Sequence, residues 1–255
     1  HLHAGCHIFA GLVVEGIDGN LFDASPHMMD AAYYGKPNYS DEHKSGTQSL
    51  VFSSSTGGYL QLPYEVANSE ELTVAMWVNM LVNSQWQRLF DFGYDTDHYM
   101  FFTPNNGNRQ LCFGIKNGGD ELTVTADQTL TLQQWCHVAV TIGKNKTAIY
   151  VDGKEVASSA GIIIRPTDIH PLLNFIGRSQ FPSDPIFNGK IDDIRIYNYA
   201  ISAEEITQVI SDTVNGVLQP SVKTSSPQIY GIDGVKRQKP RPGVNIIDEK
   251  KVILR

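Results

Sequence analysis

Closely spaced carboxylates are the residues in this chain whose types could support hydrolysis. Asp95 and Asp97 stand two positions apart, which places both side chains on one face of an extended segment. A glycosidase needs two carboxylates about 5–9 Å apart across its sugar. However, Asp95 and Asp97 lie in a turn-like stretch rich in glycine, tyrosine and aspartate, and no glutamate accompanies them. We therefore expect no catalytic pair here.

Other catalytic patterns are missing from the sequence. Glu70-Glu71 precedes a strand-like run, and Glu204-Glu205 opens a helix-like run. No Gly-x-Ser-x-Gly elbow offers a serine nucleophile, and the eight histidines show no metal-ligand spacing. His137 lies in a strand-like run, where a packed residue is the favoured interpretation over a base. The sequence predicts a protein that is not an enzyme.

Aromatic rings beside planar polar side chains are a combination that binds sugars, because the ring covers a sugar face while the polar groups bond to hydroxyls. The richest such stretch runs from Asp91 to Tyr99. Packing of Trp86 and Tyr94 against a loop is the alternative interpretation. The predicted carbohydrate-binding residues are Trp86, Tyr94, Asp95, Asp97, Tyr99 and Arg178.

Two aspartate-containing segments could supply oxygen ligands to a calcium ion. Asp18-Gly-Asn20 is a tight polar loop, and Asp192-Asp193 begins a strand-like run. Ca²⁺ takes six to eight oxygens from carboxylates, amides and backbone carbonyls. Asp192 and Asp193 should point to opposite faces of a strand, so only one of them is expected to be a ligand. The alternative is a simple turn at Asp18, with the aspartates capping or paired with Arg195 or Arg178.

The composition of the 255-residue chain is that of an ordinary globular protein. Hydrophobic residues make up 41% and charged residues 18%, and the formal net charge is −7. Lys and Arg gather only near the C-terminus, in the loop Val235–Pro242, which we interpret as a solvated turn and not as a contact for an anionic surface. We therefore expect no nucleic-acid partner. No apolar run approaches the roughly 18 residues that span a membrane.

The three cysteines form neither a metal-binding pair nor a disulfide framework. Cys112 and Cys136 lie in strand-like runs, and buried free thiols are favoured over a bridge between them. The start of the chain shows no charged region followed by an apolar one, so we interpret it as a mature or excised segment.

Period-two alternation dominates the chain from Ile8 to Tyr197. One face of the run Leu72–Met80 is apolar, and so is one face of His137–Ile142. Turn signals such as Gly143–Lys146 and Asp152-Gly153 separate these runs, and no helical crossovers intervene. About a dozen such runs predict an all-β fold, a two-sheet antiparallel jelly-roll sandwich.

One short helix and a small β tail follow the strands. Ser202 and Glu205 form a capping-box pattern, and Ile206, Val209 and Ile210 make an apolar stripe at helical spacing. The predicted divisions are a sandwich over residues 1–212, a linker over 213–227, and a C-terminal β unit over 228–255. Three short strands are expected in that unit, which is too small to be stable alone and should dock on something.

Three stretches in order carry a family resemblance. They are Gly16–Ser25, then Trp135–Ile142 continuing through Ile149–Lys154, and then Ile176–Arg178 with Phe187–Ser202. Over residues 8 to 212 the chain resembles the laminin-G-like domains of the concanavalin A-like lectin/glucanase superfamily. The stretches Arg88–Gly93 and Tyr99–Phe102 further resemble copies appended to bacterial glycoside hydrolases that act on plant polysaccharides.

The resemblance implies a calcium ion that clamps the ends of the sandwich, and we expect Asp18, Asn20 and Asp193 to bind it. Catalytic relatives on this fold carry a Glu-x-Asp-x-Glu run on one strand, which this sequence lacks. The tail Ile229–Leu254 is similar to short C-terminal units of secreted proteins from gut polysaccharide-degrading bacteria. We therefore expect a secreted, periplasmic or cell-surface bacterial location.

The function that the sequence predicts is a non-catalytic carbohydrate-binding or accessory module of a secreted polysaccharide-degrading protein. Its expected partners are a plant polysaccharide or host glycan and the adjacent domains of a parent protein. Two alternatives remain open. One is a glycoside hydrolase on the same jelly roll, and the other is a structural or protein-interaction spacer.

Overall fold

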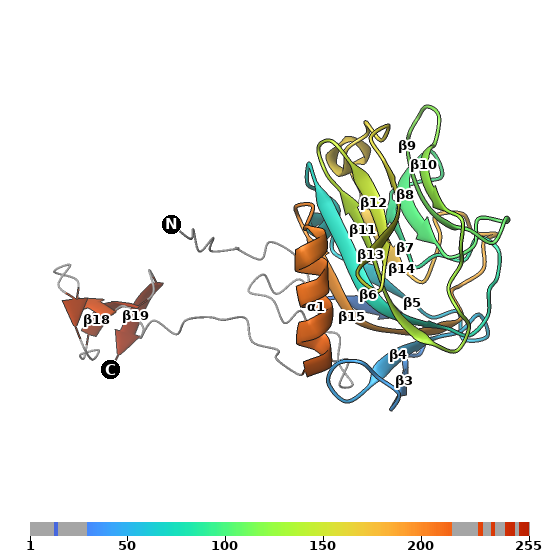
Figure 1. The fold of residues 1–255 in the computed structure, drawn as a ribbon. Helices are drawn as coiled ribbons and strands as arrows, with labels where there is room; N and C mark the ends of the chain where they lie inside the picture. Colours follow the sequence, from blue (N-terminus) through green and yellow to red (C-terminus); the bar gives the residue numbers. More distant parts are fainter. Residues whose placement is uncertain are drawn as a thin grey trace. The chain divides into compact units, whose positions relative to one another are not determined.

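The computed structural model describes residues 13–14, 30–215, 229–231, 236–237, 243–247 and 250–254, with side chains described over 30–213. Contacts divide the chain into two compact units, His1–Gly216 and Val217–Arg255, which are drawn in Figure 1. The larger unit holds two β-sheets, and the smaller holds a third.

The first sheet of the larger unit has eight strands, and every pairing is antiparallel. Its order is β13 (Lys154–Ser159), β12 (Thr147–Val151), β11 (Trp135–Ile142), β6 (Leu72–Met80), β15 (Gly189–Tyr197), β4 (Ser49–Phe52) and β3 (Asn38–Ser40), with β1 (Val13–Val14) paired to β15.

The second sheet has seven strands, again all antiparallel. Its order is β10 (Leu122–Ala126), β9 (Leu111–Asn117), β8 (His98–Thr103), β7 (Phe90–Gly93), β14 (Leu173–Ile176), β5 (Tyr59–Leu62) and β2 (Ala32–Tyr34). Strands distant in sequence, such as β7 and β14, lie side by side because the chain passes repeatedly between the sheets. The predicted two-sheet antiparallel jelly-roll sandwich is confirmed.

The core lies between the two sheets, and period-two alternation builds it. The apolar face predicted for β6 is buried there, with Leu72, Val74, Met76, Val78 and Met80 all in one cluster. On the second sheet Phe90, Phe92 and Phe102 fill the same layer. Each fully buried side chain of this size contributes about 1.5–3 kcal/mol. Residues at the alternate positions must therefore point to the outer faces of the sandwich.

Turns fall at predicted positions. Asp152 and Gly153, between β12 and β13, have φ values of 49° and 77°, the left-handed region that Asp-Gly hairpin turns use. The N–H of Gly143 donates to the carbonyl of Lys146 at 2.9 Å and closes the turn between β11 and β12. Two short 3-10 helices, η1 (Tyr64–Ala67) and η2 (Pro166–Ile169), complete the connections.

The helix α1 (Ala203–Asn215) covers part of the outer face of the first sheet, as Figure 1 shows. It begins with the predicted capping box, because the Ser202 N–H donates to Glu205 Oε2 at 2.7 Å and the Glu205 N–H donates to Ser202 Oγ at 3.2 Å. Ile206 and Val209 of the helix pack on small and aromatic side chains of the sheet, including Ala75. The helix runs to Asn215, a few residues into the segment predicted as a linker.

The smaller unit is a four-stranded sheet. Its order is β17 (Lys236–Arg237), β16 (Ile229–Gly231), β18 (Gly243–Ile247) and β19 (Lys250–Leu254). Three of these strands were expected, but β17 falls in the basic loop that the sequence indicated as a solvated turn. Its pairing with β16 uses backbone groups, which the charged side chains do not reveal.

Cys112 and Cys136 are free and buried, in agreement with the favoured interpretation. They belong to different sheets, on β9 and β11. Within the described part of the chain, no helix has the length and apolar character to cross a membrane.

Candidate functional site

The outer face of the second sheet carries the candidate site. A row of paired residues crosses five neighbouring strands on this face, from Gly114 on β9 through Phe101, Asp91 and Phe175 to Gln61 on β5. Phe101 lies against Gly114, where a Cβ atom would stand 2.5 Å from the ring. The row therefore places a carboxylate between two phenylalanine rings, with the strands fixing their order.

Arg88 and Trp86 cover one end of this row. The Arg88 guanidinium stands 4.1 Å from the centroid of the Phe101 ring and 5.6 Å from that of Trp86. Trp86 has a φ of 64°, a left-handed conformation that a bulky residue rarely adopts. Two hydrogen bonds hold it there: its N–H donates to the Asn105 carbonyl, and its own carbonyl accepts from Arg88 Nη1, both at 2.8 Å. The backbone strain keeps the partly exposed indole on this face.

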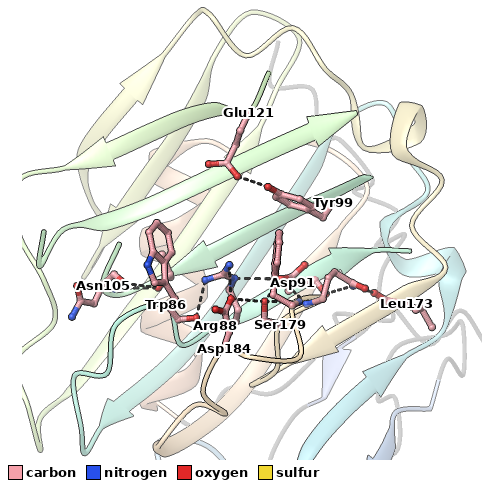
Figure 2. Close-up of polar contacts among 12 residues, drawn as sticks. Trp86, Arg88, Asp91, Tyr99, Asn105, Glu121, Leu173, Ser179 and Asp184 are labelled. Atoms are coloured by element: carbon pink, nitrogen blue, oxygen red, sulfur yellow. Dashed lines mark hydrogen bonds and ion pairs between the residues drawn. The ribbon is translucent and has the colours of Figure 1, made fainter. Parts of the chain in front are cut away.

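A buried ion-pair network lies beneath Trp86, and Figure 2 shows its geometry. Arg88 Nε stands 3.3 Å from Asp91 Oδ2, and Arg88 Nη2 stands 3.1 Å from Asp184 Oδ2. Arg88 is only 3% exposed and Asp91 is 0% exposed. One buried guanidinium is thus shared by two carboxylates, the fully buried Asp91 and the partly exposed Asp184.

Asp91 is the most deeply buried member of this network. Its Oδ2 accepts from the Gln180 N–H at 3.1 Å, while Oδ1 has no hydrogen-bond partner among the described residues. Burial raises the pKa of Asp91 to about 7, although Arg88, the Gln180 N–H and the Ser179 hydroxyl act to lower it. The carboxylate therefore titrates near neutral pH.

The segment after β14 closes over the network. Ser179 Oγ lies 3.2 Å from Asp91 Oδ2 and 2.8 Å from Asp184 Oδ2. Gln180 Nε2 donates to the Leu173 carbonyl at 2.8 Å, which ties the segment to the edge of β14. The ring centroid of Phe181 lies 5.5 Å from that of Tyr99. These bonds make the segment a rigid part of the face.

Tyr99 forms the floor beside this segment. It is 5% exposed, and its hydroxyl donates to Glu121 Oε2 at 2.6 Å. Burial, together with the bond to Glu121, raises the pKa of Tyr99. The phenol is thus a neutral donor committed to the exposed Glu121 carboxylate, and its ring supports Phe181 and Phe101.

A second cluster occupies the other end of the row. Arg178 stands 4.5 Å from the centroid of the Tyr59 ring and 4.8 Å from that of Phe175. Tyr59 stacks in parallel on Tyr34 at 5.0 Å, with an interplanar angle of 2°, and Tyr34 is 45% exposed. Among the described residues Arg178 has no hydrogen bond or ion pair. Its charge is held by aromatic rings alone.

The predicted residues Tyr94, Asp95 and Asp97 lie apart from this face, in the turn between β7 and β8. Asp95 Oδ1 accepts the backbone N–H groups of Asp97 and His98, both at 2.8 Å, and Asp97 pairs with Lys116 at 2.7 Å. Tyr94 stacks on His98 at 4.7 Å. The Asp95 carboxylate therefore builds the turn, in the bonding pattern of an Asx-turn, whereas the Asp97 carboxylate is engaged by Lys116 on β9.

The structure thus brings three of the predicted sugar-binding residues, Trp86, Tyr99 and Arg178, onto one face. The sequence reasoning missed most of the side chains that surround them there: Tyr34, Tyr59, Arg88, Phe101, Phe175 and Glu121. One signal was available, since the alternation of Phe90, Asp91 and Phe92 already places the carboxylate opposite the core.

Asp193, the described member of the predicted calcium site, is engaged within the fold. Its Oδ1 accepts from Arg195 Nε at 2.9 Å, and its Oδ2 accepts the Thr213 hydroxyl at the end of α1. A bulge at Asp192 gives Asp193 a φ of 48°, so the simple strand alternation expected for the pair does not hold. Asp192 instead accepts the backbone N–H groups of Lys44 and Ser45.

A guanidinium beside the carboxylate disfavours a divalent cation at Asp193 in this arrangement. The structure shows no cluster of three or more His, Cys, Asp or Glu side chains suited to a metal within the residues it describes. Asp18 and Asn20 lie outside those residues, so the calcium site stays a prediction.

Comparisons with solved structures find the same fold in other proteins. Domain 4 of a GH43 extracellular arabinanase from Geobacillus stearothermophilus, in complex with arabinotriose, is 19% identical over 78% of this chain and 97% of that one, with a TM-score of 0.69. The CBM40 of the Ruminococcus gnavus IT-sialidase, bound to α2,3 sialyllactose, is 16% identical over 57% of this chain and 84% of that one, with a TM-score of 0.51.

The binding domain of botulinum neurotoxin serotype C1 is 17% identical over 79% of this chain, with a TM-score of 0.62, and the chain spans 51% of its length. A search of the curated proteins finds no match. The family model of the concanavalin A-like lectin/glucanases superfamily matches residues 54–207, more than half of the sequence. The chain therefore belongs to the concanavalin A-like lectin/glucanase superfamily.

Proposed function

We propose that this chain is a non-catalytic carbohydrate-binding module that contacts its glycan with the outer face of the second sheet. The observation that carries the proposal is the set of partly exposed aromatic rings on that face. Trp86 and Phe181 lie at one end, and Tyr59 and Tyr34 lie at the other. Rings of this kind cover the apolar face of a sugar, while neighbouring polar groups bond to its hydroxyls.

The contrast between the two sheets supports this choice of face. The outer face of the first sheet packs against Ile206 and Val209 of α1 and buries its aromatic residues Tyr150 and Tyr197. In Figure 1 the helix lies on that side, away from β7, β8 and β9. Aromatic rings that a helix does not cover are the ones available to a ligand.

Relatives of the same fold support the ligand class. The arabinanase domain was solved with arabinotriose and the sialidase module with α2,3 sialyllactose. A sugar ligand for this chain is thus consistent with both neighbours, one of which belongs to an extracellular enzyme. We therefore propose an accessory role in a secreted bacterial protein that degrades polysaccharides.

The carboxylates of the second sheet support a binding role over a hydrolytic one. Asp91 is buried and paired with Arg88, and Asp184 shares that partner. Glu121 accepts the Tyr99 hydroxyl, Asp95 accepts backbone N–H groups of the β7–β8 turn, and Asp97 pairs with Lys116. Each of these carboxylates already has a partner, whereas a glycosidase needs a free acid and a free base across the sugar.

A glycan array that contains plant oligosaccharides and host glycans tests the proposal. We expect at least one neutral or acidic oligosaccharide to bind, and Trp86→Ala to weaken that binding by about tenfold or more because the indole is lost from the face. Tyr64→Ala removes a more exposed ring, in η1, and serves as the control.

Two results would overturn the proposal. The absence of any binder at millimolar concentration would favour the structural spacer. Hydrolysis of aryl glycosides or arabinoxylan that disappears in Asp95→Asn or Asp97→Asn would favour the hydrolase.

The predicted calcium ion is tested separately by thermal unfolding. A structural Ca²⁺ bound at Asp18 and Asn20 should raise the melting temperature when CaCl₂ replaces EDTA, since a ligand of the native state stabilises it. If the melting temperature is the same in CaCl₂ and in EDTA, and Asp18→Ala does not change it either, the protein has no structural calcium ion at this loop.

A further inference from the structure

Arg178 is a cation on the outer face of the second sheet that has no charged partner among the residues the structure describes. Its guanidinium stands over Tyr59 and Phe175, at 4.5 and 4.8 Å from the ring centroids. The described residues provide it with no carboxylate, carbonyl or hydroxyl partner. The planar fork of N–H donors is therefore held in position by the rings while its hydrogen-bonding capacity is unused.

The surroundings of Arg178 suit the ring of a sugar. Tyr59 also stacks in parallel on Tyr34, which is 45% exposed, so the ring that contacts the guanidinium belongs to an aromatic stack that reaches solvent. Gln61 on the same strand as Tyr59 lies in register with Phe175 on the same face. A planar cation beside an open aromatic surface can bond to a carboxylate and cover the sugar ring that carries it.

The opposite end of the face is unfavourable for a negatively charged group of a ligand. There Arg88 is already shared by Asp91 and Asp184, and Glu121 adds a further exposed carboxylate. Phe101 and Phe175, which support the two arginines, are separated by one strand, and two strand spacings amount to roughly 10 Å. An anionic group is thus attracted to the Arg178 end and repelled from the other.

Resting on the proposed function, we infer that Arg178 makes this face selective for glycans that carry a carboxylate, as sialic acids and uronic acids do. The carboxylate accepts two parallel hydrogen bonds from the Arg178 guanidinium, and the ring of the acidic sugar lies against Tyr34. Neutral sugars of the same glycan extend toward Trp86. Arg178 is then the specificity-determining residue of the site.

Matched pairs of ligands test this inference by isothermal titration calorimetry on the full chain. One pair is 3′-sialyllactose and lactose, and the other is a xylo-oligosaccharide with and without a single glucuronic acid branch. In at least one pair the acidic member should bind about tenfold tighter, as expected for a hydrogen-bonded charge. The pair that shows the preference identifies the acid as sialic or uronic. The preference should weaken as NaCl is added.

Arg178→Met keeps an unbranched chain over the rings and removes the charge. It should abolish the preference, so that the acidic and neutral members of each pair bind with affinities within about twofold of each other, and Lys154→Met on β13 of the first sheet should leave both affinities unchanged. Circular dichroism and the melting temperature check that each variant is folded.

Equal affinities within both pairs would overturn the inference and leave the proposed function standing, provided that the neutral members bind. A preference that survives in Arg178→Met would also overturn it. If neither these ligands nor any array glycan binds, both the inference and the proposed function fail.

Discussion

Two arginines stand over phenylalanine rings on the same sheet face, and their surroundings differ. Arg88 lies over Phe101, is 3% exposed and shares its charge with Asp91 and Asp184. Arg178 lies over Phe175, is partly exposed and, within the described part of the chain, contacts aromatic rings without any ion pair. The first arrangement stabilises a closed segment of the chain, and the second leaves a cation available to a ligand. Similar contacts therefore serve structure at one end of the face and recognition at the other.

The largest expected effect is on stability and belongs to Arg88. Arg88→Met leaves the buried Asp91 carboxylate without its cation and also removes the partner of Asp184, so we expect a loss of about 3–5 kcal/mol in the free energy of unfolding. Arg178→Met breaks no ion pair and should cost less than about 1 kcal/mol. Urea unfolding at one fixed pH measures both values.

The double variant Arg88→Met/Asp91→Asn is the control for this comparison. Removing the uncompensated charge should restore part of the loss. Equal losses in Arg88→Met and Arg178→Met would contradict the division into a structural and a recognition arginine.

A smaller effect concerns the pH dependence of stability, through Asp91. Its pKa is raised from 3.8 to about 7 in the folded protein, so the unfolded chain loses this proton first. The contribution of Asp91 to stability is therefore present below about pH 4 and is lost as the pH rises through 7. In Asp91→Asn this fall should be absent.

The quantity to measure is the difference in the free energy of unfolding between wild type and Asp91→Asn. A second group, His137, changes stability with pH in the opposite direction. Burial lowers the pKa of His137 to about 3 from 6.5, so its contribution is lost as the pH falls from 6.5 toward 3. A difference curve from urea unfolding at several pH values cancels His137. A difference that stays flat between pH 4 and 7 would show that Asp91 remains ionised, and Arg88 would then be its fully compensating partner.

The smallest expected effect is on glycan affinity at the Arg178 end of the face. Tyr34→Ala removes the exposed half of the Tyr34–Tyr59 stack and should weaken binding of the preferred glycan by about fivefold, with little change in stability. Tyr94→Ala, in the β7–β8 turn, removes a ring of similar exposure away from Arg178 and should change affinity by less than about twofold. Calorimetry of the two variants compares them directly. Equal losses would extend the site to the turn.

The local features of this protein could be predicted from its sequence. Alternation along Leu72–Met80 predicted the core face, and the capping box of Ser202 and Glu205 predicted the helix, because both depend on residues close together in the chain. The same alternation puts Asp91 on the face opposite Phe90 and Phe92. Local spacing was enough for each of these.

The composition of the site could not be predicted in the same way. The row from Phe101 through Asp91 to Phe175 joins strands from distant parts of the chain, and the pairing of β7 with β14 sets it. Asp95 and Asp97 had the spacing of a catalytic pair, but turn formation uses the Asp95 carboxylate and Lys116 pairs with that of Asp97, a competition that spacing alone does not reveal. Asp193 likewise depends on a bulge that shifts the register of β15.

The most direct test of the central claim is an NMR titration of isotope-labelled protein with the best-binding oligosaccharide. We predict chemical-shift changes for the side-chain N–H signals of Trp86 and Arg178, which lie on the outer face of the second sheet. The indole signal of Trp77, buried on the first sheet, should stay in place. Shifts at Trp77 without any at Trp86 or Arg178 would contradict the account and move the binding site to another face.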